Sequence, residues 1–198
     1  METGLVQNRM FSAPVNTLYE YLLVAHPDEM VYRQVMAEKQ LFTAQYQQQV
    51  AAKTKPHITV ANFLAKEEME STLIRWMHRV ISSQRKFKVT LDRYSGFPPH
   101  TIYLRVQDHQ PFQQLAKELK VVDQYVRSYG CPAAHLITHP HLTLARRLPE
   151  DVYRRAETVY AQKAFSASFD VNELVLLRRQ HQFDTCKQVS VFGLQTIS

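Results

Sequence analysis

The sequence predicts an α+β domain with two pseudo-symmetric lobes, each an antiparallel sheet with outer helices, around a central cleft. Two observations predict this fold class. Strand-like and helix-like spacings of apolar residues follow the order strand, helix, strand, strand, and this order occurs twice. Residues 56–61 (PHITVA) also recur as residues 140–145 (PHLTLA), a shift of 84 residues. We therefore expect one bilobal domain over residues 17–198, preceded by a flexible N-terminal arm, residues 1–16.

The chain is expected to begin with a buried strand and a long helix. Residues 18–25 (LYEYLLVA) form a short aliphatic and aromatic run, which is typical of a buried strand. Pro27, Asp28 and Glu29 then favour a helix start, because proline and acidic residues are common in the first turn. We expect this helix to continue to about Tyr46.

The first copy of the repeated unit follows a polar linker. Residues 57–63 (HITVANF) are rich in β-branched residues after a proline and predict a strand. Residues 66–83 carry apolar residues at helical spacing, and residues 87–94 alternate as a strand does. A break at 95–99 (SGFPP) separates that strand from the next, residues 101–106.

A helix and a loop precede the second copy, which begins at residue 141 and repeats this order. Residues 111–128 predict one helix, because their apolar residues fall on a single stripe, and a loop follows over 129–140. Residues 141–145 (HLTLA) predict a strand, and 149–162 predict a helix that Pro, Glu and Asp begin. The remaining strands are expected at 165–171, 174–177 and 189–194.

Composition excludes several classes of protein. The chain has 198 residues, of which 45% are hydrophobic and 21% charged, as in ordinary folded domains. It has only four glycines and neither of the usual glycine-rich phosphate-binding patterns. A formal charge of +6 favours an anionic partner such as RNA or a phosphorylated small molecule. A modestly basic, solvated surface is the alternative.

Cysteine usage and hydropathy indicate the compartment. Cys131 and Cys186 are too few for a disulfide framework, and they lack the spacing of a zinc site. Residues 1–11 do not resemble a signal peptide, and no apolar run approaches the roughly 18 residues of a membrane span. We expect a cytoplasmic monomer with no membrane partner.

Two His-x-Thr triplets are the candidate site. His57-Ile-Thr59 and His141-Leu-Thr143 occupy the same position in the two copies of the repeat. Residues i and i+2 of a strand point to one face, so each His projects together with its Thr. The spacing alone arises readily by chance, and a histidine satisfied within its strand is the alternative for each triplet taken singly. Their matched position in a duplicated unit favours function.

These residue types suit phosphodiester chemistry. Pseudo-symmetry can bring the two pairs face to face around one anion-sized space. Histidine has an ordinary pKa near 6.5, so one ring can accept a proton while the other, protonated, donates one. Threonine hydroxyls can donate hydrogen bonds to non-bridging phosphate oxygens. We expect this chemistry to need neither a metal nor a cofactor.

At these motifs the chain resembles the 2H phosphoesterase superfamily, specifically the 2′-5′ RNA ligase-like (LigT-type) proteins. Two H-x-[S/T]-hydrophobic motifs are its signature, and further segments are similar in order and spacing. The matching segments are HITV (57–60), GFP (96–98), TIYLRV (101–106), PFQQLAKEL (111–119), HLTLAR (141–146) and VNELVLL (171–177). The likeness covers about residues 17–195. The chain departs from the family pattern at ANFLAK (61–66) and RRQHQFDTCK (178–187).

The resemblance implies a function and roles for five residues. It implies metal-independent action on 2′,3′-cyclic phosphates, 1″,2″-cyclic phosphates or 2′-5′ linkages of RNA or nucleotides, with reverse ligation in some members. It implies catalytic roles for His57 and His141, phosphate binding by Thr59 and Thr143, and a supporting charge from Arg146. A non-catalytic module that binds RNA ends or nucleotides in the same cleft is the alternative.

Several neighbouring residues have open roles. His139 could pair with His141 as a metal ligand, but a loop histidine at the cleft mouth is the stronger expectation, because no carboxylates cluster nearby. Arg178 and Arg179 could contact a phosphate or belong to a solvated hairpin. Three aromatic residues could stack on a base or pack in the core. They are Tyr94, Phe97 and Tyr103, of which Tyr103 is the strongest core candidate.

Overall fold

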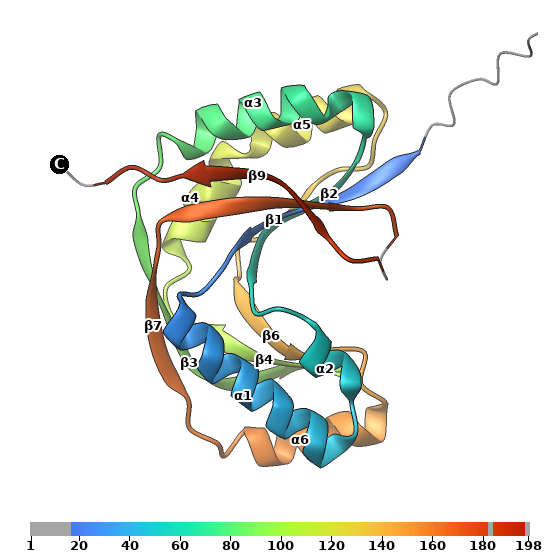
Figure 1. Ribbon diagram of the computed structural model, residues 1–198, viewed down its shortest axis with the longest axis vertical. Helices are drawn as coiled ribbons and strands as arrows, with labels where there is room; N and C mark the ends of the chain where they lie inside the picture. Colours follow the sequence, from blue (N-terminus) through green and yellow to red (C-terminus); the bar gives the residue numbers. More distant parts are fainter. Residues whose placement is uncertain (1–16, 182–183, 197–198) are drawn as a thin grey trace, which may run out of the picture.

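A computed structural model describes residues 17–181 and 184–196 and confirms the α+β fold class (Figure 1). The described strands form one antiparallel sheet in the order β7-β3-β4-β6-β2-β1-β8-β9, and β5 pairs with β2. The predicted arm, residues 1–16, lies outside the described residues. Within the described ranges, no helix has the length and apolar character needed to cross a membrane.

The helices and strands have the following bounds. The strands are β1 (Leu18–Ala25), β2 (Ile58–Lys66), β3 (Phe87–Phe97), β4 (Thr101–Val106), β5 (His135–Leu136), β6 (His141–Ala145), β7 (Ser166–Val171), β8 (Glu173–Arg179) and β9 (Lys187–Gly193). The helices are α1 (Glu29–Tyr46), α2 (Gln49–Lys53), the 3₁₀ turn η1 (Glu67–Met69), α3 (Glu70–Ile81), α4 (Gln110–Glu118), α5 (Lys120–Ser128) and α6 (Glu150–Tyr160).

The structure differs from the sequence prediction in four places. The single helix expected over 111–128 is two helices, α4 and α5, which meet at Leu119. Periodicity hides this bend because the buried stripe continues through Leu115, Leu119 and Val122. β3 extends to Phe97, into the predicted break at 95–99, because its last residues pair with β4. The linker before β2 contains α2, and the loop before β6 contains β5.

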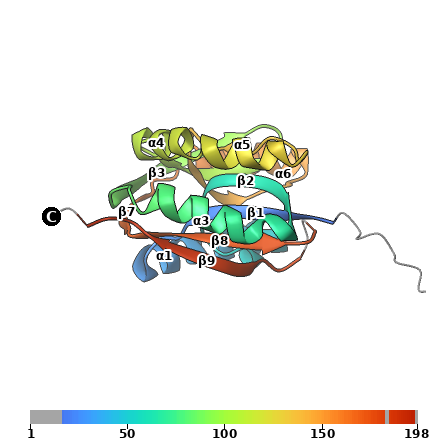
Figure 2. The same ribbon diagram turned by 90° about the horizontal axis from the view of Figure 1, so that it is seen from above.

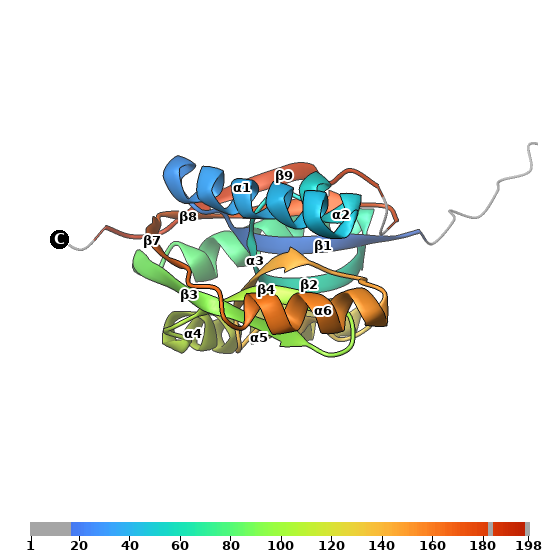
Figure 3. The same cartoon turned by 90° about the horizontal axis from the view of Figure 1, so that it is seen from below.

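The sheet has two halves that meet at one strand pair. One half contains β7, β3, β4 and β6, and the other contains β2, β1, β8 and β9. They join where Ile58 of β2 pairs with Leu142 of β6. Helices α1, α2 and α6 pack on the first half, and α3, α4 and α5 lie over the second (Figures 2 and 3). The repeat therefore places β2 and β6 next to each other at the centre of the sheet.

The repeat extends to backbone irregularities. The register of β1 against β2 shifts between Leu23 and Val24, which leaves Val60 as an extra residue in β2. The register of β4 against β6 shifts in the same way, and the extra residue there is Leu144. Val60 and Leu144 are equivalent in the 84-residue repeat. Both are fully buried, so each bulge turns an apolar side chain inward directly after a His-x-Thr triplet.

Close packing explains why a glycine stands at position 96, in the segment GFP (96–98) of β3. A Cβ at this position would lie 2.3 Å from the Tyr153 hydroxyl oxygen of α6, and Tyr153 is only 2% exposed. We expect Gly96→Ala to lower the free energy of unfolding by about 1–3 kcal/mol, because a buried ring must move. Urea denaturation of Gly96→Ala, Tyr153→Phe and the double variant would measure this.

The Gly96→Ala, Tyr153→Phe double variant separates the steric clash between the new Cβ and the Tyr153 hydroxyl from other effects of Gly96→Ala. Removing the hydroxyl should recover part of the loss, so the two substitutions should couple favourably. Strictly additive changes would show that the contact does not cause the loss.

Candidate active site

The two His-x-Thr triplets lie side by side in the centre of the sheet. Ile58 and Leu142 pair across the antiparallel β2–β6 ladder, and both are fully buried. Alternation therefore places the flanking residues on the opposite face, with His57 across from Thr143 and Thr59 across from His141. The four side chains are half-buried. In such a ladder diagonal neighbours lie about 7–8 Å apart, so one phosphate group fits between the two imidazoles.

Equivalent backbone contacts orient the two rings. The Nδ1 atom of His57 lies 2.8 Å from the carbonyl oxygen of Lys55, and that of His141 lies 3.4 Å from the carbonyl oxygen of His139. A carbonyl oxygen only accepts hydrogen bonds, so Nδ1 is the donor in each ring. The Nε2 atom then carries the lone pair of the neutral ring, which is the form that a general base requires.

Burial keeps both imidazoles neutral in the free protein. It lowers the pKa of His57 to about 4, and the positive charges of His26, Lys39 and Arg146 act in the same direction. Burial also lowers the pKa of His141. A bound anion would oppose these effects, because negative charge beside an imidazole favours its protonated form. A phosphate ligand therefore supplies the condition under which one ring gains a proton.

The lowered pKa of His57 predicts how stability depends on pH. The unfolded chain has a histidine pKa near 6.5, so between about pH 6.5 and pH 4 it binds a proton that folded His57 does not. The free energy of unfolding should therefore fall by up to about 3 kcal/mol as pH drops through this window. Urea midpoints at pH 7 and pH 4.5 should show this fall in the wild type and a smaller one in His57→Gln. His78→Gln, an exposed site on α3, is the control, and equal falls in all three proteins would contradict the prediction.

Aromatic rings surround His141. The rings of Phe97 and Tyr103 stack with centroids 4.3 Å apart, and each centroid lies 5.0 Å from that of His141. Tyr94, the third aromatic candidate, is 6% exposed and donates a hydrogen bond of 2.8 Å to Glu38, so it belongs to the core. Tyr103 is half-buried and Phe97 is exposed. These two candidates lie at the site because both rings contact His141.

The arginine candidates have different positions. Arg146 directly follows β6 and is exposed, and its charge acts on both His57 and Lys39. Arg179 forms an ion pair of 2.5 Å with Glu20, which also accepts a hydrogen bond from Asn62. A phosphate role for Arg146 is therefore compatible with its position, whereas the Arg179 guanidinium already has a carboxylate partner.

The side chains of Arg178 and His139 contact residues outside the two triplets. Arg178 pairs with Glu67 and Glu70 at 2.9 and 2.8 Å, so it ties β8 to the start of α3, and its guanidinium already has two carboxylate partners. The His139 side chain is exposed and packs edge-on against His109 at 5.4 Å. Across residues 17–181 and 184–196, no group of three or more His, Cys, Asp or Glu side chains is arranged to hold a metal.

Lys39 is a site neighbour that the sequence prediction missed. It is 1% exposed, and its Nζ donates hydrogen bonds to the carbonyl oxygens of Leu144 and Ala51 and to the Thr54 hydroxyl, at 3.0–3.3 Å. It thereby joins α1 to the bulge of β6 and to the segment that leads into His57. A lysine in the middle of the buried stripe of α1, between Val35 and Phe42, is the sequence signal that could have revealed it.

His26 is a second neighbour that the sequence did not reveal. Its ring lies 6.4 Å from the His57 ring, and its Nδ1 atom lies 3.1 Å from the carbonyl oxygen of Pro56. His26 directly follows β1, and β1 pairs with β2, which lies more than 30 residues later in the sequence. No local pattern therefore signals the contact between His26 and His57.

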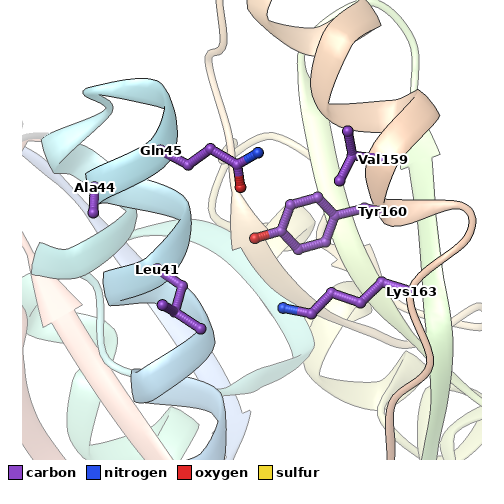
Figure 4. Close-up of a pocket in the computed structure, with 6 residues that line it drawn as sticks. All are labelled: Leu41, Ala44, Gln45, Val159, Tyr160 and Lys163. Atoms are coloured by element: carbon purple, nitrogen blue, oxygen red, sulfur yellow. The ribbon is translucent and has the colours of Figure 1, made fainter.

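A cavity of about 500 Å³ lies elsewhere, between α1 and α6 (Figure 4). Its lining is mainly apolar and includes none of the predicted site residues. The lining residues are Leu41, Ala44, Gln45, Val159, Tyr160 and Lys163. A phosphodiester site needs converging polar donors, so the His-x-Thr pairs at the β2–β6 junction are the better candidate.

Comparisons with known proteins identify the family and the fold. Residues 27–182 match the family model described as the 2'-5' RNA ligase superfamily. Escherichia coli LigT complexed with 3'-AMP has a TM-score of 0.62 at 17% identity, over 89% of this chain and 98% of LigT. The Thermus thermophilus protein TT0787 has a TM-score of 0.66 at 18% identity, over 88% and 97%. Usb1 of Kluyveromyces marxianus gives 0.50 at 13%, over 91% and 100%. No curated protein sequence matches the chain.

Proposed function

The chain belongs to the 2'-5' RNA ligase superfamily, and on that premise we propose that it is a metal-independent phosphodiesterase with two catalytic histidines. The proposed substrates are 2′,3′-cyclic phosphates, 1″,2″-cyclic phosphates or 2′-5′ linkages of RNA or nucleotides. Ligation through a 2′-5′ bond would be the reverse reaction at the same site. A cytoplasmic location and a monomeric state remain predictions.

One observation supports this proposal above all others. The pairing of Ile58 with Leu142 brings two His-x-Thr triplets from opposite halves of the sheet onto one face as direct neighbours. Hydrolysis of a phosphodiester needs a base on the attacking side and an acid on the leaving side. Two imidazoles on a diagonal, with a hydroxyl across from each, match that need.

Hydrolysis of a 2′,3′-cyclic phosphate would proceed as follows. The neutral imidazole takes a proton from water while the water oxygen forms a bond to phosphorus. The bond between phosphorus and one ribose oxygen breaks, and the protonated imidazole donates its proton to that oxygen. The product is a nucleoside 2′- or 3′-monophosphate, or the corresponding RNA end. The two rings end with exchanged protonation states, which proton exchange with solvent restores.

The threonines and Arg146 would act on the remaining phosphate oxygens. Negative charge on the non-bridging oxygens grows as phosphorus becomes five-coordinate. The hydroxyls of Thr59 and Thr143 would donate hydrogen bonds to these oxygens, so their effect is larger in the transition state than in the bound substrate. Arg146 would contribute positive charge from the end of β6. E. coli LigT has been crystallised with phosphate and with 3'-AMP, which are chemically close to the proposed product.

Turnover of 2′,3′-cyclic AMP by the purified protein in excess EDTA tests the proposed function. Formation of adenosine 2′- or 3′-monophosphate in EDTA, and its absence with a His57→Ala, His141→Ala double variant prepared in parallel, is the expected result. The parallel preparation controls for contaminating nucleases. Activity that EDTA abolishes would overturn the metal-independent mechanism, and equal activity of the double variant would overturn the site.

The second candidate function is nucleotide or RNA-end binding without turnover. It draws support from the lowered pKa values of both histidines, because two neutral rings provide a base but no acid. This candidate predicts that 3′-AMP binds while 2′,3′-cyclic AMP remains intact over hours. It also predicts binding that weakens with salt, as phosphate contacts do.

A further inference from the structure

Phe97 is an exposed aromatic ring beside the proposed catalytic residues. It is 43% exposed, although one face stacks on Tyr103 at 4.3 Å. Its centroid lies 5.0 Å from that of His141, with the two rings nearly perpendicular at 78°. Burying this ring would be favourable, so its exposure at the site leaves apolar surface available to a ligand.

The strand register places these aromatic residues on the face of the His-x-Thr pairs. Tyr103 of β4 is paired with Thr143 of β6 on one side and with Ser95 of β3 on the other. Phe97 lies two residues after Ser95, so alternation keeps it on the same face. The two stacked rings therefore lie on the same sheet face as the expected phosphate position, between it and the β3–β4 turn.

We propose that Phe97, supported by Tyr103, is the stacking platform for the nucleobase of the substrate. This inference rests on the proposed function of the two histidines and narrows its substrate class. A cyclic phosphate at the end of a nucleoside or RNA places its base one ribose away from the phosphorus. The site thus selects base-bearing cyclic phosphates over cyclic phosphates without a base at that distance, such as the 1″,2″ class.

Stacking on Phe97 does not discriminate among the four nucleobases. Every nucleobase has a π face, so stacking on Phe97 tolerates all four bases. Discrimination among bases would need hydrogen bonds to their edges, and the platform itself has only aromatic carbon on Phe97. We therefore expect similar kcat/KM values for purine cyclic phosphates and somewhat lower values for pyrimidines, which stack over a smaller area.

Two substrates and three variants test the platform. The substrates are 2′,3′-cyclic AMP and glycerol 1,2-cyclic phosphate, which has the same five-membered phosphate ring without ribose or base. The variants are Phe97→Ala, Phe97→Trp, which preserves a stacking face, and Tyr129→Ala. Tyr129 is the matched control, because it is a 47% exposed aromatic residue after α5, outside the site.

The expected result is a substrate-dependent loss. Phe97→Ala should lower kcat/KM for 2′,3′-cyclic AMP by about 5- to 150-fold, mainly through KM, and leave glycerol 1,2-cyclic phosphate within about twofold. Phe97→Trp should restore most of the loss, and Tyr129→Ala should change neither substrate. An equal loss on both substrates would mean that Phe97 only orients His141, and it would overturn the platform, as would no loss on either.

Binding measurements separate this inference from the proposed function. If the wild type turns over neither substrate, the enzyme assignment fails, but titration calorimetry with 3′-AMP and with inorganic phosphate still tests the platform. Weaker 3′-AMP binding by Phe97→Ala, with phosphate binding unchanged, would support it. Equal binding of 3′-AMP by the two proteins, or no binding of 3′-AMP by the wild type, would overturn it.

Discussion

Replacing either catalytic histidine with alanine should lower kcat/KM for 2′,3′-cyclic AMP by about 100- to 10,000-fold. Each ring is proposed to move a different proton, so neither can replace the other. Both rings lie on one face of the β2–β6 junction, and each is oriented through Nδ1 by a carbonyl oxygen two residues upstream. Initial rates of His57→Ala and His141→Ala, with His78→Ala as an exposed control, measure the effect.

The choice of leaving group distinguishes the two roles. A phosphodiester of 4-nitrophenol releases a weakly basic oxygen, which needs no proton. The variant that lacks the acid should therefore keep most of its activity on this substrate, whereas the variant that lacks the base should lose it. The low pKa of His57 favours His57 as the base. Equal losses for both variants on both substrates would contradict separate acid and base roles.

The second large effect is expected at the threonines. Thr59→Val or Thr143→Val should lower kcat by about 100-fold, because each removes a donor to an oxygen whose charge grows in the transition state. Valine keeps the shape and the strand preference of threonine, so folding should be preserved. Steady-state kinetics should show a larger change in kcat than in KM, since the hydrogen bonds strengthen as the reaction proceeds.

Matched substitutions make this prediction specific. Thr158 is an exposed residue of α6 whose hydroxyl donates to the carbonyl oxygen of Arg154, and Thr158→Val should leave both constants unchanged. Circular dichroism and urea midpoints would establish that the Thr59 and Thr143 variants are folded. A rise in KM with kcat unchanged would mean that the hydroxyls bind substrate and transition state equally, against the proposed role.

Much of the fold could be predicted because the relevant patterns are local. The bounds expected for β1, β4 and β6 agree with the structure, since short apolar runs between turn residues leave few alternatives. The break at Leu119 and the extension of β3 could not be predicted in this way. Both depend on packing against or pairing with segments whose position the periodicity of one segment does not reveal.

The features of the candidate site likewise separate into those that local patterns determine and those that depend on the tertiary structure. The sequence by itself determined the repeat, the two His-x-Thr triplets and the fact that His and Thr share a face, because each follows from spacings of two residues or from direct comparison of two segments. Only the tertiary structure decided that His57 lies across from Thr143, that Lys39 reaches Leu144 and that Phe97 reaches His141. These contacts join residues more than 40 positions apart, and they depend on strand register and helix packing. Register and packing are set by the complementary surfaces of whole elements, which no local spacing encodes.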